Sequence, residues 1–494
     1  MSPKTGAKQT QTPGRVIDPA TVQRYNRNAN YHNIPIKKSR NDYLKQTLRK
    51  TTSKWNNAAE KAIDYDDILL PESSGYLVPE HELERTWKLK QGDLKKSADV
   101  ATSQKIFDLD LPTLGPYRVD YTRNGRHLLI GGKKGHLATF NWKTGKLGCE
   151  IQVQETIRDV KWLHNETMFA VAQKKYVYIY DNTGIELHCL RNHIEVNQLE
   201  FLPYHFLMAS VGNAGYLKYQ DTSTGKIIAE MRTGLGRCDV MAQNRYNAIM
   251  HLGHSNGTVT LWSPNMTSPL VKMLCHRGPV TALAMDRDGL YMASAGLDGQ
   301  LAIWDIRTFK PLHSYYTPTP ASSLSISDLG LIGVGFGPHV HVWKDAFLTK
   351  QMSPYMTHMK PGTSVQNVRF VPYEDVLGIG HSAGVSSIAI PGAGEPNFDS
   401  LEANPYQNRK QRREAEVHSL LDKIQPEMIV MNPEFVGTLD RAPGEVIAAG
   451  KKVEYEANNP KEKYKPKHKA RGKSSAKNKF IRKQKNVIHR GSAV

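Results

Sequence analysis

The chain has 494 residues, of which 39% are apolar, and it carries 66 Lys and Arg against 47 Asp and Glu. This apolar content can bury a large core, so the composition excludes a chain that is disordered throughout. Its apolar runs, such as residues 331–336, are far shorter than the roughly 20 residues of a membrane helix. The first residues lack the apolar segment of a secretory signal, and the four cysteines form no C-x-x-C pair, which disfavours a disulfide scaffold and a cysteine zinc site. These features predict a soluble intracellular protein without a cofactor.

The positive charge gathers at the two ends of the chain. Residues 1–54 hold 12 Lys and Arg against two acids, a net charge of +10. Residues 451–494 hold 15 Lys and Arg against three acids, a net charge of +12, so residues 55–450 carry −3. The sequence therefore predicts a near-neutral body between two strongly basic arms.

The first arm, residues 1–104, is predicted to be basic, partly extended and partly helical. Residues 1–40 have an extended, basic composition, whereas residues 43–62 and 79–94 have patterns compatible with helices. Trp55 and Trp87 lie in these two stretches. Because large aromatic side chains are costly to expose, we expect each to pack either on the rest of the protein or in a groove of a partner.

A unit of about 40 residues repeats along residues 105–391, which make 287 positions. Each copy has an apolar run, a Gly-bearing turn and an alternating strand, as in 253–262 and 296–305. The positions that close the third strand are 38 to 47 residues apart: Trp142, Tyr180, Gln220, Trp262, Trp304, Trp343 and Ile390. This spacing is typical of WD-repeat blades. The sequence therefore predicts an all-β fold, a seven-bladed WD-repeat β-propeller with partly helical, basic terminal extensions.

One repeat carries nearly the whole WD signature, with Trp304 followed by Asp305. In WD-repeat families, residues at these positions form a hydrogen-bonded tetrad that fixes the blade. We assign that structural role to His276, Ser294, Asp298 and Trp304. The other repeats are degenerate.

The seventh repeat supplies only three strands, near 365–371, 375–380 and 385–390. Residues 105–111, upstream of the first blade, form an isolated strand-like run. We predict that this run pairs into the last blade, because it would close the ring and cover an exposed strand edge.

Residues 380–384 match the G-x-S-x-G pattern of a hydrolase nucleophile around Ser382. That motif requires a helix after the serine, but here an alternating strand follows and residues 253–257 repeat the same turn. The sequence has neither a phosphate-binding P-loop nor an H-E-x-x-H zinc helix. His339 and His341 are more simply a satisfied or exposed pair than metal ligands. We therefore expect no catalytic residue, no metal, no small-molecule substrate and no enzymatic activity.

The segment after the propeller, residues 392–445, is predicted to contain a docking helix over 408–425, ended by Pro426. Its apolar residues have helical spacing and its first turns are basic, so the helix either folds back on a blade or grips a partner. Together with the two tryptophans outside the propeller, we assign partner docking to Trp55, Trp87, Arg409, Arg412, Arg413, Val417, Leu420, Leu421 and Ile424.

The second arm, residues 446–494, is Lys-rich and has no apolar face, so we expect it to be disordered when free. Its cations could neutralise nucleic-acid phosphates and release counterions, or serve as a nuclear import signal. The residues assigned to RNA binding are Lys463, Lys465, Lys467, Lys469, Arg471, Lys473, Lys477, Lys479, Arg482, Lys483 and Lys485.

Three stretches, 370–384, 391–400 and 404–414, together with 84–90, resemble the BING-four/Utp-seven family of nucleolar WD-repeat proteins. The likeness spans roughly residues 80–445, and the post-propeller segment is its most specific part. The resemblance implies a non-enzymatic assembly factor of the small-subunit processome in the nucleus and nucleolus. Its implied partners are pre-ribosomal RNA, the U-three snoRNA and other processome proteins, with no membrane.

The alternative is a nuclear WD-repeat adaptor for protein partners, of the chromatin or ubiquitin-ligase type. In that case the basic tail would be only an import signal. Association with a large, RNA-dependent particle would favour the assembly factor over the adaptor.

Overall fold

The computed structural model describes residues 42–66, 74–81, 84–400, 402–433, 448–453, 455, 478–481 and 483–484. The chain divides into two compact units, Met1–Pro433 and Glu434–Val494. The described residues of the second unit are helical. None of the helices in the described ranges is long and apolar enough to cross a bilayer.

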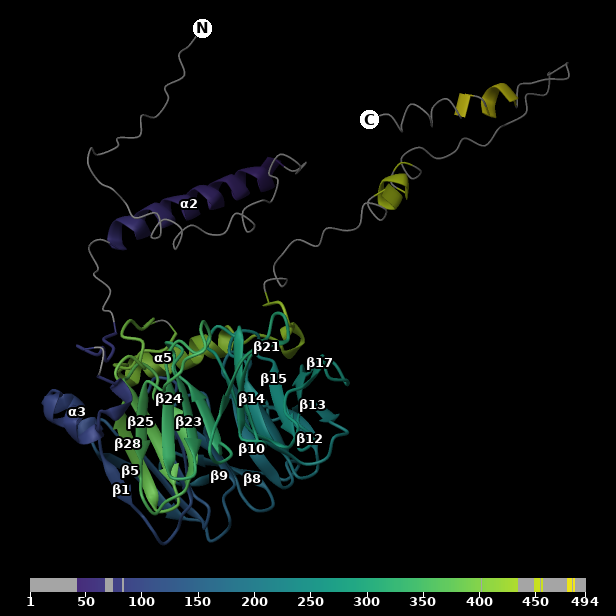
Figure 1. Cartoon of the computed structure of the whole chain (residues 1–494). Helices are drawn as coiled ribbons and strands as arrows, with labels where there is room; N and C mark the ends of the chain where they lie inside the picture. Colours follow the sequence, from purple (N-terminus) through teal and green to yellow (C-terminus); the bar gives the residue numbers. More distant parts are fainter. Residues whose placement is uncertain are drawn as a thin grey trace, which may run out of the picture. The chain divides into compact units, whose positions relative to one another are not determined.

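The N-terminal arm contains several short elements and one long helix (Figure 1). They are α2 (Asp42–Asp66), η3 (Thr86–Lys88), α3 (Gln91–Ser97) and α4 (Val100–Lys105). The helix expected over 79–94 is therefore wrong as a single element. The helical sequence pattern of this stretch is overridden by hydrogen bonds to distant strands. The Thr357 hydroxyl donates to the Trp87 carbonyl at 2.9 Å, and the side-chain amide nitrogen of Gln91 donates to the Ala389 carbonyl at 2.9 Å. The extended stretch expected over 1–40 lies outside the described residues.

Seven four-stranded antiparallel sheets form the propeller, which confirms the predicted fold. The first three blades consist of β2 (Tyr117–Tyr121), β3 (Leu128–Gly132), β4 (His136–Asn141), β5 (Lys146–Gln152), β6 (Asp159–Trp162), β7 (Met168–Ala172), β8 (Val177–Asp181), β9 (Glu186–Leu190), β10 (Val196–Leu202), β11 (Leu207–Gly212), β12 (Tyr216–Asp221) and β13 (Ile227–Arg232).

The next three blades consist of β14 (Cys238–Gln243), β15 (Met250–His254), β16 (Thr258–Trp262), β17 (Val271–Leu274), β18 (Val280–Met285), β19 (Tyr291–Gly296), β20 (Gln300–Asp305), β21 (Lys310–Tyr316), β22 (Ser323–Ile326), β23 (Ile332–Phe336), β24 (His339–Trp343) and β25 (Met356–Met359). Blade 7 combines β26 (Val365–Phe370), β27 (Val376–His381) and β28 (Gly384–Ala389) with β1 (Asp108–Asp110). The seven predicted anchor residues lie in the third strand of their blades or directly after it.

The position of a strand within its blade explains its sequence pattern. Second strands such as β3 and β27 are buried along their whole length, because neighbouring blades cover both faces, and they read as continuous apolar runs. Outer strands such as β5 have one buried residue among exposed and half-buried ones. The core therefore lies between the blades.

The ring is closed by the N-terminal strand, as predicted. β1 pairs antiparallel with β28, with Asp108 opposite Ser386 and Asp110 opposite Gly384. The pairing continues through the Leu111 amide, which donates to the Ala383 carbonyl at 2.7 Å. At the far end of β28, the side chain of Gln91 bonds both backbone groups of Ala389, each at 2.9 Å, and so extends the short closing strand.

Side chains on inner strands join successive blades. An Asp120 carboxylate oxygen accepts the Trp162 amide at 3.0 Å, and Asp159 accepts the Leu199 amide at 2.8 Å. Ion pairs add to this ring, including Lys161 with Glu200 at 2.8 Å. Asp120, Lys161 and Glu200 line a central cavity of about 560 Å³ that is bordered by inner strands.

The segment after blade 7 crosses one face of the propeller (Figure 1) and contains α5 (Arg409–Leu421) and η4 (Pro426–Met428). The helix ends four residues before the predicted position 425. It ends there because the Ile424 amide donates to the Tyr204 carbonyl at 3.0 Å and Lys423 pairs with Asp221, both on blade 3. Beyond η4, Ile429 is buried in the core of blade 4, where its carbonyl accepts the Ser263 hydroxyl at 2.8 Å.

Candidate functional site

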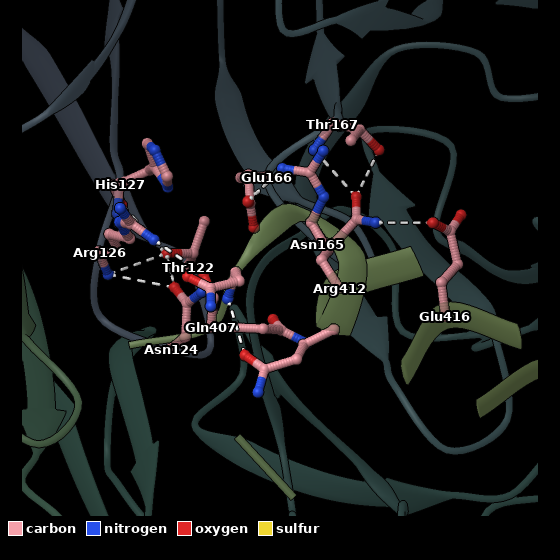
Figure 2. Close-up of polar contacts among 12 residues, drawn as sticks. Thr122, Asn124, Arg126, His127, Asn165, Glu166, Thr167, Gln407, Arg412 and Glu416 are labelled. Carbon is pink, nitrogen blue, oxygen red and sulfur yellow. Dashed lines mark hydrogen bonds and ion pairs between the residues drawn. The ribbon is translucent and has the colours of Figure 1, made fainter. Parts of the chain in front are cut away.

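The first candidate site is the contact between α5 and blades 1 and 2 (Figure 2). Arg412 pairs with Glu166 at 2.6 Å, between Nη1 and Oε1. One turn later, the Glu416 carboxylate contacts His164 at 3.0 Å and accepts from the Asn165 amide at 3.3 Å. Since residues four apart share one helix face, α5 docks on the propeller with a polar face.

The apolar face of α5 is left exposed. Val417 is 56% exposed, Leu420 42% and Leu421 76%, and Ile424, which lies beyond the end of the helix, is 39% exposed. Of the two alternatives for this helix, the structure has it folded on the propeller, but through residues other than its apolar stripe. Three exposed apolar side chains at helical spacing, with a fourth just past the helix, are typical of a protein-binding face.

Sequence reasoning missed most of the residues that position α5. Glu166, His164 and Asn165 lie in the loop between β6 and β7 and carry no motif. A signal was present on the helix itself, because Arg412 and Glu416 are four residues apart and of opposite charge. Arg412, one of the residues that the sequence assigns to partner docking, pairs with Glu166 within the chain.

A cavity of about 510 Å³ lies between the start of α5 and blades 1 and 2. His127 lines this cavity, and the Arg126 guanidinium beside it donates to the Gln407 carbonyl at 3.2 Å. Burial lowers the pKa of His127; Arg126 and Arg412 also lower it, and Glu166 opposes them. The imidazole is therefore neutral at pH 7, and the local positive charge comes from Arg and Lys side chains.

The four residues of the WD signature form one chain of contacts on blade 5. His276 Nε2 lies 2.8 Å from the Ser294 hydroxyl, and the Trp304 indole donates to the same hydroxyl at 3.0 Å. His276 Nδ1 lies 3.3 Å from an Asp298 carboxylate oxygen. Blade 3 has a variant of this chain, in which His193 contacts both Ser210 and Gln220 at 2.6 Å. Gln220 thus takes the place of the usual tryptophan.

The other predicted docking residues lie on different elements. Trp55 lies in α2 and is 38% exposed, whereas Trp87 lies in η3 beside β25 and is 37% exposed. Arg409 and Arg413 are exposed on α5. Most of the predicted RNA-binding positions lie outside the described residues: Lys463, Lys465, Lys467, Lys469, Arg471, Lys473, Lys477, Arg482 and Lys485. Lys479 and Lys483 lie in helical residues of the second unit and are exposed.

Ser382 lies in the tight turn between β27 and β28, and its hydroxyl accepts the Ser364 amide at 3.1 Å. The serine is followed by a strand rather than the helix that a nucleophile elbow requires. His339 and His341 both lie on β24, with ring centroids 6.4 Å apart. Across the described ranges, no three His, Cys, Asp or Glu side chains are grouped as metal ligands.

The seven-bladed ring and the tetrad on blade 5 define a WD-repeat β-propeller protein. The family described as WD domain, G-beta repeat matches residues 267–305, which include that tetrad. The family described as BING4CT (NUC141) domain matches residues 354–432, which include the strands β26 to β28 of blade 7, α5 and η4.

Several proteins resemble the chain over most of its length. U3 small nucleolar RNA-associated protein 7 of Saccharomyces cerevisiae is 49% identical over 414 residues, 81% of this chain and 74% of the relative. WD repeat-containing protein 46 of Homo sapiens is 50% identical over 378 residues, 76% of this chain and 62% of the relative. Its counterpart in Caenorhabditis elegans is 45% identical over 402 residues, 81% of this chain and 69% of the relative. The chain belongs to the BING-four/Utp-seven family.

Proposed function

We propose that this protein is a non-enzymatic assembly factor of the small-subunit processome, acting in pre-rRNA processing and 18S rRNA maturation for the small ribosomal subunit. One observation carries the proposal: a relative that is 49% identical over 81% of this chain is named U3 small nucleolar RNA-associated protein 7. Its site of action is the nucleus and nucleolus. Its partners are pre-ribosomal RNA, the U-three snoRNA and other processome proteins.

The architecture supports different binding roles for the propeller, which contacts proteins, and for the basic ends of the chain, which contact RNA. A propeller closed by its own N-terminal strand is a rigid platform with several separate faces. Residues 1–54 and 451–494, with net charges of +10 and +12, bind RNA phosphates through their Lys and Arg side chains, contacts that position the protein without reading sequence. The exposed apolar face of α5 binds a protein.

Crosslinking in cells tests the RNA contact. The tagged full-length protein and a chain ending at Gly450 are irradiated, and the bound RNA is sequenced. We expect reads concentrated on pre-ribosomal RNA and the U-three snoRNA, and fewer reads after truncation. Reads at background level for the full-length chain would instead support a protein-only nuclear adaptor whose tail is an import signal.

The protein contact of α5 is tested separately by Leu421→Glu. Leu421 is 76% exposed, so the substitution leaves the fold intact while placing a charge on the apolar face. We expect the variant to sediment less with the large RNA-containing particle. Leu274→Glu is the matched control, since Leu274 is 71% exposed on the outer strand of blade 4. Equal sedimentation of the two variants would remove α5 from the interface.

A further inference from the structure

The cavity at the start of α5 is enclosed by the propeller and by the helix, and its lining carries more basic than acidic side chains. Blade 1 contributes β4, β5 and the loop before β3, and blade 2 contributes the end of β6, Glu166 and the turn after β8. Residues 407–409 and 412 complete the wall. Its volume of about 510 Å³ is in the range of sites that hold a small molecule or a nucleotide. Arg412 and Glu166 pair at its wall and fix the helix in place.

Cations outnumber acids around this cavity. Four basic side chains line it, and a single carboxylate opposes them: Arg126, Lys146, Arg409 and Arg412 against Glu166. The carboxylate is already paired with Arg412. Lys146 and Arg409 are exposed, and neither has an acidic partner within the described ranges. Two cations are thus available to an anion from outside.

The helix itself adds to this positive potential. The first amide groups of α5, a helix of 13 residues, lack carbonyl partners within the helix. The Asn408 side chain caps the Gln411 amide, which leaves the amides of residues 409 and 410 at the N-terminus. Aligned peptide dipoles make such a terminus favourable for phosphate. The helix begins at Arg409, which lines the cavity.

Buried polar atoms in the wall have no partner in the protein. Trp162 lines the cavity and is only 4% exposed, yet its indole Nε1–H makes no hydrogen bond to any residue that the structure describes. His127 Nδ1 is likewise buried and makes no hydrogen bond to any residue that the structure describes. Because buried polar groups are normally satisfied, these two unpaired atoms mark a polar wall behind the lining of the cavity.

The ligand chemistry is decided by size and by the aromatic wall. A carboxylate from an acidic protein segment would satisfy the charge but leave most of the cavity empty. The half-buried rings of His127 and Phe140 line it, and flat rings of this kind stack on nucleic-acid bases. We propose that the cavity binds one phosphate of an RNA strand together with its adjoining nucleoside, which rests on the proposed function but places an RNA contact on the folded body.

Salt-dependent binding of the full-length chain tests this site. Fluorescence anisotropy measures affinity for a labelled single-stranded oligouridylate at several salt concentrations, for the wild type and for Lys146→Gln/Arg409→Gln. Losing the cations that neutralise this one phosphate on a single strand should lower the slope of log affinity against log salt by about 0.7. The control is Arg232→Gln/Lys310→Gln, with the same change of charge at exposed positions of β13 and β21; its slope should stay at the wild-type value.

Mapping of RNA crosslinks by mass spectrometry provides a second readout. An adduct on the peptide containing Phe140 or Trp162 supports the cavity as a nucleotide site. Equal slopes for both double variants, with adducts confined to the arms, would overturn the cavity while leaving RNA binding intact. A wild-type chain that binds no RNA would overturn both proposals. Release of RNA from the cavity by a hexaglutamate peptide at equal concentration would show that the site takes protein carboxylates instead.

Discussion

At the scale of single residues, hydrogen bonds between side chains hold the blades. The tetrad on blade 5 buries the polar groups of His276, Ser294 and Trp304, which are hydrogen-bonded to one another. On blade 3, His193 and Gln220 form a similar buried hydrogen bond. Such networks fix side-chain positions because an unpaired buried polar group is costly. The degenerate repeats therefore keep the physical function of the tetrad after losing its sequence signature.

Trp304→Phe tests the tetrad directly. The change removes the indole donor to the Ser294 hydroxyl, which lies 3.0 Å away, but retains an aromatic ring. We expect the free energy of unfolding to fall by about 1 to 3 kcal/mol, measured by urea denaturation. Trp343→Phe is the control, since the Trp343 indole makes no hydrogen bond to a described residue; an equal loss there would assign the effect to ring size.

Buried histidines predict a stability that falls in mild acid. Burial lowers the pKa of His193, His251 and His254 to about 4, below the ordinary 6.5. Between pH 6.5 and pH 4 these histidines are therefore protonated in the unfolded chain but neutral in the native protein. The free energy of unfolding is highest above pH 6.5 and decreases as the pH falls toward 4. We expect a loss on the order of 1 to 2 kcal/mol per histidine between pH 7 and pH 5.

The urea midpoint at the two pH values checks this expectation, repeated at high salt to remove general charge repulsion. His188→Gln serves as the control, because His188 is exposed and its loss should leave the pH dependence unchanged. A midpoint that is equal at pH 7 and pH 5 would contradict the burial argument.

At the scale of elements, a helix or strand could be predicted from the sequence where the contacts that form it are close together in the chain, and could not where its contacts are with distant residues. Strands of the seventh repeat were predicted within a few residues, since apolar runs and Gly-bearing turns record the burial of a blade strand in its own sequence. The expected helix over 79–94 failed because Trp87 and Gln91 bond to residues more than 260 positions away. The docking face of α5 was missed for the same reason: its partners lie on blade 2.

Arg412→Ala should loosen α5 without unfolding the propeller. The ion pair with Glu166 is partly buried and spans 246 residues of sequence, so its loss leaves a carboxylate without its cation. We expect faster amide hydrogen exchange over 409–421, by roughly tenfold for a loss of about 1.4 kcal/mol in local stability. Arg413→Ala, an exposed neighbour, should have no such effect. Protection that stays the same in both variants would show that the remaining contacts of α5 suffice.

At the scale of the whole molecule, stability depends on ring closure. Gly384 lies opposite Asp110 in the closing pair and has a φ of +148°, and an added Cβ would lie 1.9 Å from the Leu109 carbonyl oxygen. A side chain at this position therefore forces β1 away from β28. The closing pair is short, so a local clash acts on the entire ring.

Gly384→Ala should destabilise the protein by several kcal/mol, because both the backbone strain and the clash oppose it. Thermal unfolding followed by circular dichroism measures the shift in Tm. Gly362→Ala isolates the backbone effect, since Gly362 has a φ of +73° but nothing within 4 Å of an added Cβ. That control should lose only about 1 kcal/mol. Equal shifts would show that β1 is not required for closure.

The N-terminal closing strand also has a consequence for synthesis on the ribosome. β1 leaves the exit tunnel before every other strand of the propeller, whereas its partner β28 is made only after the six intervening blades. Until then the nascent chain is an open arc with unpaired strand edges at both ends, a state prone to pairing with other chains. Every molecule must pass through that interval, so the final step of folding is the meeting of the first and last strands of the ring.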